Sequence, residues 1–148
     1  MLASRIATTI SVAALVLVPV ACGGDDSSDV TKEEFIANAD AVCKETNDKI
    51  EALVDDLSED TSAEEAAQFT VDEAIPLFRD QIDQLRDLDL PAADADDIEQ
   101  LWDDLDTSTD ELEQQLKDDP EVAFSEDFDP FADENKAATD YGFKECGG

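Results

Sequence analysis

Carboxylates are the most abundant side chains in this sequence that could do chemistry. The 148-residue chain carries 41 Asp and Glu residues against 9 Lys and Arg residues, which gives a formal net charge of −32. It contains no histidine, which excludes Ser-His-Asp and Cys-His catalysis as well as imidazole metal ligands. Because proteins contact nucleic-acid phosphates mainly through Lys and Arg, the charge also argues against a nucleic-acid partner.

Paired carboxylates could still act as a general acid and base, as they do in glycosidases. With 41 acids in the chain, however, some pair must lie close, so proximity alone carries little information. The GxSxG, Walker A and GxGxxG patterns of other enzymes do not occur. The sequence therefore favours a non-catalytic protein without a cofactor, and an enzyme built on carboxylates alone is the alternative.

Divalent cations are a second possible use for the carboxylates. An EF-hand loop needs acids at positions 1, 3 and 5, glycine at 6 and glutamate at 12. Counted from Asp104, Thr109 stands at the glycine position and Gln115 at the glutamate position, so no dedicated metal site is predicted. We interpret the acidic surface as a solvated shell, with weak Ca²⁺ or Mg²⁺ binding as the alternative function. The candidates for loose cation association are Asp118, Asp119, Glu126, Asp127 and Asp129.

The N-terminus has the layout of an export signal. Arg5 is its only charge, and residues 6–21 form an uncharged, largely apolar run that is shorter than the ~20 residues of a membrane-spanning helix. The run ends in Pro19-Val20-Ala21-Cys22. A small residue directly before a cysteine resembles the lipobox of bacterial lipoproteins, although Pro19 departs from the aliphatic residue usual at its position. An ordinary signal peptide, cut elsewhere, is the other interpretation.

The lipobox resemblance implies how the chain is organised. In lipoproteins the signal peptide is cleaved directly before the cysteine, and the cysteine is diacylated. Residues 1–21 would then be the signal peptide, residues 22–30 the lipidated Cys22 with a flexible Gly- and Ser-containing tether, and residues 31–148 a helical domain. Two acyl chains suffice for stable anchoring, so the expected partner of the N-terminus is the membrane and the expected location is extracytoplasmic.

The remaining cysteines predict a disulfide. Three cysteines are an odd number for an exported protein, but lipidation of Cys22 would leave Cys43 and Cys146 as an even pair. An oxidising compartment favours a bond between them, and it would close a loop of about 100 residues. A reactive thiol is the alternative, which the apolar helix face around Cys43 disfavours. No CxxC pattern supports a zinc or thioredoxin-like site.

The elements that must position these residues are helices. Hydrophobic residues make up 42% of the chain, enough for a packed core and too many for a disordered acidic tail. Thr31 and Glu34 match a capping box at the start of the first helix. Apolar residues spaced three and four apart, with their caps, predict helices over about 32–57, 63–88, 93–117 and 130–141.

Proline and glycine shape this helical pattern. Pro76 lies inside the second predicted helix and should kink it or split it near Phe69 and Thr70. Asp129 is expected to cap the last helix, and Gly142 sits where a left-handed C-cap belongs. We predict an all-α fold, a four-helix up-down bundle with a kinked second helix, whose C-terminus a disulfide ties to the first helix.

Aromatic residues are expected to fill the core and cover its end. Trp102 falls within a buried stripe at helical spacing, so a core position is favoured over a ligand platform. Phe124, Phe128 and Phe131 are expected to cover one end of the bundle. If that cover is incomplete, they would form an apolar patch that could bind a partner.

Two short motifs resemble a group of small exported lipoproteins common in actinobacteria. One is Phe35-x3-Ala39-Asp40-x2-Cys43, and the other is Tyr141-Gly142-Phe143-Lys144-Glu145-Cys146-Gly147. Residues 88–91 also approximate that group's proline stop after the second helix. The resemblance implies this fold and location, and it assigns no functional residue. We therefore predict a lipid-anchored, non-catalytic interaction protein at the cell surface, with a cationic protein or an envelope complex as its partner.

Overall fold

The computed structural model describes residues 30–55, 57–58, 60–125 and 128–147. The predicted signal peptide, Cys22, most of the tether, Glu126 and Asp127 lie outside these ranges. Within them, every regular element is helical, which confirms the all-α helical bundle. The elements are α1 (Lys32–Asp55), α2 (Ala63–Phe69), the π-helical turn η1 (Thr70–Ala74), α3 (Ile75–Arg86), α4 (Ala95–Asp118), the 3-10 helix η2 (Pro120–Phe124) and α5 (Ala132–Tyr141).

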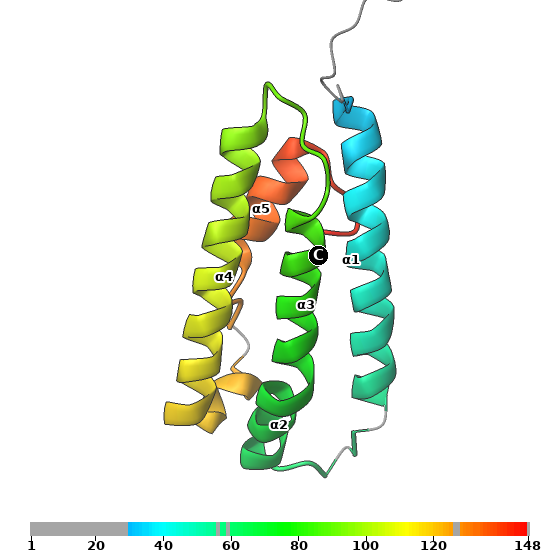
Figure 1. The fold of residues 1–148 in the computed structure, drawn as a ribbon. Helices are drawn as coiled ribbons and strands as arrows, with labels where there is room; N and C mark the ends of the chain where they lie inside the picture. The colour runs from blue at the N-terminus through cyan, green and yellow to red at the C-terminus, as the bar shows by residue number, and fades with distance from the viewer. Residues whose placement is uncertain (1–29, 56, 59, 126–127, 148) are drawn as a thin grey trace, which may run out of the picture.

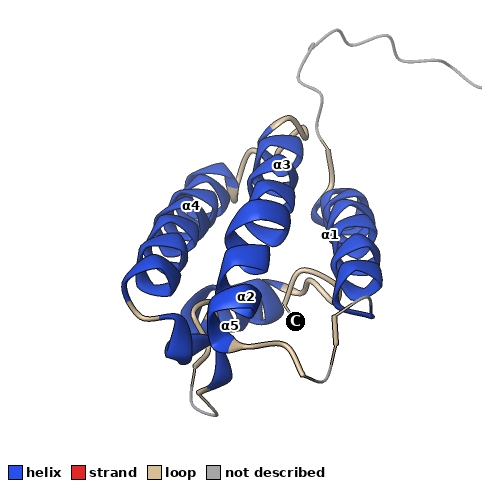
Figure 2. Cartoon of the chain, turned by 90° about the horizontal axis from the view of Figure 1, so that it is seen from below, coloured by secondary structure: helices blue, strands red, loops and turns tan. Residues whose placement is uncertain are grey.

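The long helices lie side by side, with α3 between α1 and α4 (Figure 1). Successive long helices run in opposite directions, and the shorter α5 packs against α4. Figure 2 shows α1, α3 and α4 as an arc, with α5 on its inner side. The interior therefore lies between this arc and α5.

The start of α1 follows its capping box. The backbone N–H of Glu34 donates to Thr31 Oγ1 at 3.2 Å, and the N–H of Thr31 donates to Glu34 Oε2 at 3.1 Å. These two bonds satisfy donors that a helix N-terminus otherwise leaves without partners. The predicted end of this helix at residue 57 is too late, because the N–H of Leu57 already donates to Val54 O, three residues back, in a turn.

The split of the second predicted helix is confirmed. α2 ends at Phe69, and α3 begins at Ile75 with Pro76 in its first turn. Pro76 has no N–H to donate four residues back, so the backbone widens. The N–H of Ile75, the residue before Pro76, donates to Thr70 O, five residues earlier rather than four, which is the π-helical pattern. The turn keeps Ile75, Ile82 and Leu85 on the buried face.

Three other predicted boundaries are wrong by about two residues. The second predicted helix ends at Arg86 rather than 88. The third predicted helix starts at Ala95 rather than 93. The last helix starts at Ala132, and its N-cap position is held by Phe131 without a side-chain cap. The carboxylate of Asp129 accepts the Phe131 N–H at 3.3 Å, so it forms a turn before the helix instead of capping it.

The core consists of two clusters. The larger one joins α1, α3, α4 and α5 and contains Phe35, Leu85, Ile98, Trp102 and Phe143 among its buried residues. The smaller one, at the α2 end of the bundle, contains Ala67, Ile75, Leu112 and Leu116. Trp102 is 1% exposed, which confirms its core position.

Candidate ligand pocket

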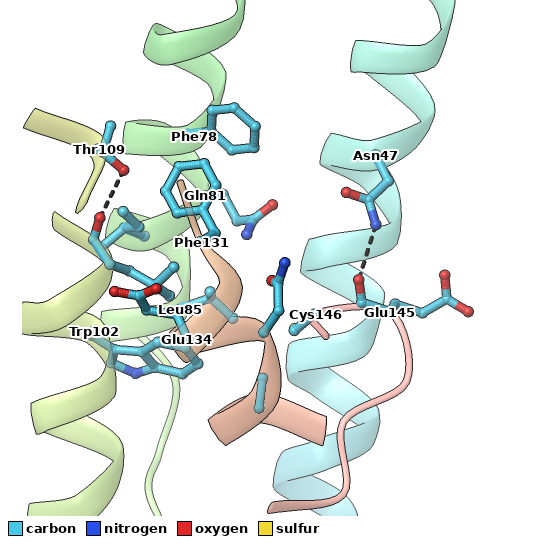
Figure 3. Close-up of a pocket in the computed structure, with 14 residues that line it drawn as sticks. Asn47, Phe78, Gln81, Leu85, Trp102, Thr109, Phe131, Glu134, Glu145 and Cys146 are labelled. Carbon is cyan, nitrogen blue, oxygen red and sulfur yellow. Dashed lines mark hydrogen bonds between the residues drawn. The ribbon is translucent and has the colours of Figure 1, made fainter. Parts of the chain in front are cut away.

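A cavity of about 210 Å³ lies in the interior between α1, α3, α4 and α5. We call it the central pocket (Figure 3). Residues 47, 78, 81, 82, 85, 102, 105, 109, 131, 134, 135, 138, 145 and 146 line it. These positions come from every long helix and from the C-terminal segment, residues 142–147, so the pocket exists only once the bundle is assembled.

Three aromatic side chains give the pocket most of its apolar wall. The rings of Phe78 and Phe131 lie 5.4 Å apart between centroids, with their planes tilted by 52°. Trp102 and Phe78 line opposite ends of the pocket, at the bottom and the top of Figure 3. The remaining apolar lining residues are Ile82, Leu85, Leu105 and Ala138. Such a wall suits an apolar or aromatic ligand body.

The polar atoms of the pocket include two acceptors that can take a further hydrogen bond. Gln81 Oε1 is buried and has no hydrogen-bond partner among the described residues. The carboxylate of Glu134 accepts a hydrogen bond from Ser108 Oγ, which leaves the second carboxylate oxygen available for another bond. The hydroxyl of Thr109 is already committed, because it donates to Leu105 O at 2.7 Å.

Two further polar groups at the pocket have defined roles. The side-chain amide of Asn47 donates to Glu145 O at 2.9 Å and so links α1 to the C-terminal segment. Trp102 Nε1 is buried, and no described residue accepts its N–H. A buried polar group without a partner costs free energy. The orphaned oxygen of Gln81 therefore marks this interior as a place for a hydrogen-bond donor.

The C-terminal segment closes one side of the pocket. Cys43 and Cys146 form a disulfide, with Cα atoms 5.1 Å apart, which confirms the predicted bond. Asp40 Oδ1 also accepts the backbone N–H groups of Lys144 and Glu145 at 2.9 and 3.0 Å. Because α1 binds this segment both covalently and through hydrogen bonds, the pocket wall is held firmly in place.

The turn into the C-terminal segment depends on a glycine. Gly142 has φ of +120°, and a Cβ added there would lie 3.3 Å from Ile36 Cδ1. The N–H of Phe143 donates back to Ala138 O at 3.1 Å, so the predicted C-cap is present. Phe143 then buries its ring against Phe35, at a centroid distance of 5.7 Å.

The three phenylalanines predicted as a partner-binding patch have different surroundings. Phe124 is 58% exposed on η2. Phe128 and Phe131 are partly buried against the smaller core cluster, and Phe131 also lines the central pocket. Partner binding by this group stays a prediction, and Phe124 is its exposed member.

The acidic candidates for cation binding serve local structure where the structure describes them. Asp119 Oδ1 accepts the Glu121 N–H at the start of η2, and Asp118 accepts the side-chain amide of Gln114. Asp129 makes the turn before α5. In the described ranges, no group of three or more His, Cys, Asp or Glu side chains is placed to hold a metal ion.

Two arginines neutralise part of the acidic face of α4. Arg79 contacts Asp110 and Glu113 at 2.6 and 2.7 Å, and each contact joins α3 to α4. Arg86 contacts residues 103 and 106 in the same way, at 2.9 and 2.7 Å. The two arginines are seven residues apart, so they share one face of α3. That spacing is visible in the sequence and was not used in the prediction.

The sequence pattern did not indicate that Gln81, Glu134 and Asn47 line a pocket. Gln81 lies three residues after Phe78 and one before Ile82, so it interrupts an apolar stripe. A polar residue on an inward face is the only sequence signal that could have drawn attention to it.

No helix in the described part of the chain is long and apolar enough to cross a membrane. Comparison of the chain with protein-family models, curated proteins and solved structures finds no match.

Proposed function

We propose that this chain is an exported lipoprotein, anchored at the outer side of the cell membrane by lipids on Cys22, whose helical domain binds a ligand or partner without catalysis. The observation that carries this proposal is the Cys43–Cys146 disulfide. Disulfides between structural cysteines persist in oxidising, extracytoplasmic compartments and are rare in the cytosol. The bond therefore supports export independently of the N-terminal sequence.

The N-terminal sequence supports the anchor. An uncharged apolar run ends at a small residue and Cys22, as in the lipobox, and the disulfide accounts for both other cysteines. Val30 stands eight positions after Cys22, and a fully extended chain spans at most about 3.6 Å per residue. The domain would thus stay within about 30 Å of the membrane surface.

Binding without catalysis is supported by the chemistry of the interior. The chain has no histidine, and the central pocket offers aromatic walls with a few polar atoms, as ligand pockets commonly do. The net charge of −32 favours cationic partners, including a cationic protein of the envelope, by raising their concentration near the surface.

Acyl labelling in the native host tests the anchor. Cells are fed a palmitate analogue that carries a clickable tag, and the protein is followed in membrane and soluble fractions. The wild-type chain is expected to be labelled and membrane-bound, whereas Cys22→Ser is expected to lose the label. The matched control replaces the other two cysteines, C43S/C146S, and should keep the label. Label on Cys22→Ser, or wild-type protein in the cytosol, would overturn the proposal.

A further inference from the structure

We infer that the central pocket binds one small organic cation, an ammonium or guanidinium group carried on an apolar or aromatic body. This inference rests on the proposed binding function, but it is independent of the lipid anchor. It depends on the size of the pocket, on its aromatic wall and on two acceptors. These are Gln81 Oε1, which has no partner among the described residues, and the second carboxylate oxygen of Glu134.

The size of the pocket suits a single small molecule. A cavity of about 150 Å³ can hold benzene, and the central pocket measures about 210 Å³. The same space would hold about seven water molecules at ~30 Å³ each. A ligand of one ring and a short polar group therefore fits, whereas a peptide or an acyl chain is too large.

The wall and the acceptors together specify a positive charge. Phe78, Phe131 and Trp102 present aromatic side chains, whose faces attract cations. Gln81 Oε1 needs a donor, and Glu134 brings a half-buried carboxylate to the same space. An ammonium group donates three hydrogen bonds and accepts none, so it suits either of these acceptors.

Anionic ligands are opposed by the same residues. A carboxylate or phosphate in the pocket would face the carboxylate of Glu134. The chain as a whole carries a net charge of −32, which repels anions and attracts cations on approach. A neutral ligand of the same shape keeps the aromatic contacts but loses the charge-assisted hydrogen bonds.

A matched ligand series tests the inference. The full chain is exported with Cys22→Ser, so that no lipid is attached, and is titrated with benzylamine, benzyl alcohol and benzoate. These probes share one ring and differ in charge. Trp102 is the only tryptophan in the sequence, so its fluorescence reports on the pocket, and calorimetry gives the affinity. Benzylamine is expected to bind saturably and at least about tenfold more tightly than benzyl alcohol, with no binding of benzoate.

Variants locate the charge. Glu134→Gln is expected to weaken benzylamine binding about tenfold or more, while Asp133→Asn, which removes the same charge from the neighbouring exposed position of α5, should change it less than about twofold. If Glu134→Gln does not fold, as judged by circular dichroism, Gln81→Leu removes the other acceptor and should also weaken binding.

Three results would overturn the inference. The first is that benzoate binds as tightly as benzylamine. The second is that none of the pocket variants changes the affinity for benzylamine. The third is that no probe binds saturably, which would mean that the pocket holds only water. Each can occur while the acyl-labelling result stands, so failure of the pocket and failure of the anchor are distinguished.

Discussion

The disulfide gives the most direct prediction about stability. The double variant C43A/C146A removes a bond that joins residues 103 positions apart. In the chain-entropy account, closing a loop of about 100 residues stabilises the native state by about 4.7 kcal/mol at 25 °C, and typical measured values are about 2–4 kcal/mol. The variant should therefore lose about 2–4.7 kcal/mol of unfolding free energy, a fall in Tm of about 10–20 °C for a domain of this size.

The contacts of the C-terminal segment predict that this variant still folds. Asp40 would continue to accept the Lys144 and Glu145 N–H groups, and Phe143, which is 3% exposed, would remain in the core. The native near-ultraviolet signal of Trp102 should therefore persist below the new Tm. These contacts act on the folded state, whereas the disulfide acts mainly on the unfolded chain.

Urea unfolding of the full chain with Cys22→Ser is the assay, with ionic strength held constant. The matched control is the same protein reduced with dithiothreitol, which breaks the bond without making a cavity at Cys43, a side chain that is 1% exposed. The reduced sample should show the loop-closure loss alone, and the variant should show that loss plus the cost of any cavity. A loss below about 1 kcal/mol would refute the loop-closure reasoning, and loss of the folded signal would refute the claim that non-covalent contacts hold the segment.

Further predictions concern the caps and the charge. Ser62→Ala removes the acceptor for the Glu65 N–H and should cost about 1 kcal/mol in urea unfolding. Hydrogen bonds from Ser62 lower the pKa of Glu65 from 4.5, so its contribution is complete above the unfolded pKa and is lost as pH falls through the folded pKa. The Tm difference between wild type and Glu65→Gln should therefore shrink as the pH falls below 4.5, and a constant difference would refute the cause. Gly142→Ala places a Cβ at φ of +120° and should cost about 1 kcal/mol or more in the same assay. NaCl, MgCl₂ and CaCl₂ at matched ionic strength should raise Tm equally by screening, whereas a saturable extra gain from one divalent ion would show a cation site.

Much of the fold could be predicted because its signals are local. The capping box of Thr31 and Glu34, the break at Pro76 and the turn at Gly142 each depend on a few neighbouring residues, and all three are present. The disulfide could be predicted by counting cysteines. The start of the last helix could not, because Asp129 bonds to the Phe131 N–H in a turn while Phe131 packs its ring on Phe78, a contact between distant segments.

The sequence by itself determined the helices and their breaks, since backbone hydrogen bonding and apolar periodicity act over a few residues. The pairing of Cys43 with Cys146 followed from the cysteine count once Cys22 was set aside for lipidation. Only the tertiary structure decided that Asn47, Gln81 and Glu134 line one cavity. These three residues lie on three helices, and nothing in their spacing distinguishes them from other polar residues of a strongly acidic chain. Their meeting depends on how the helices pack, because close packing of side chains sets which interior space stays open.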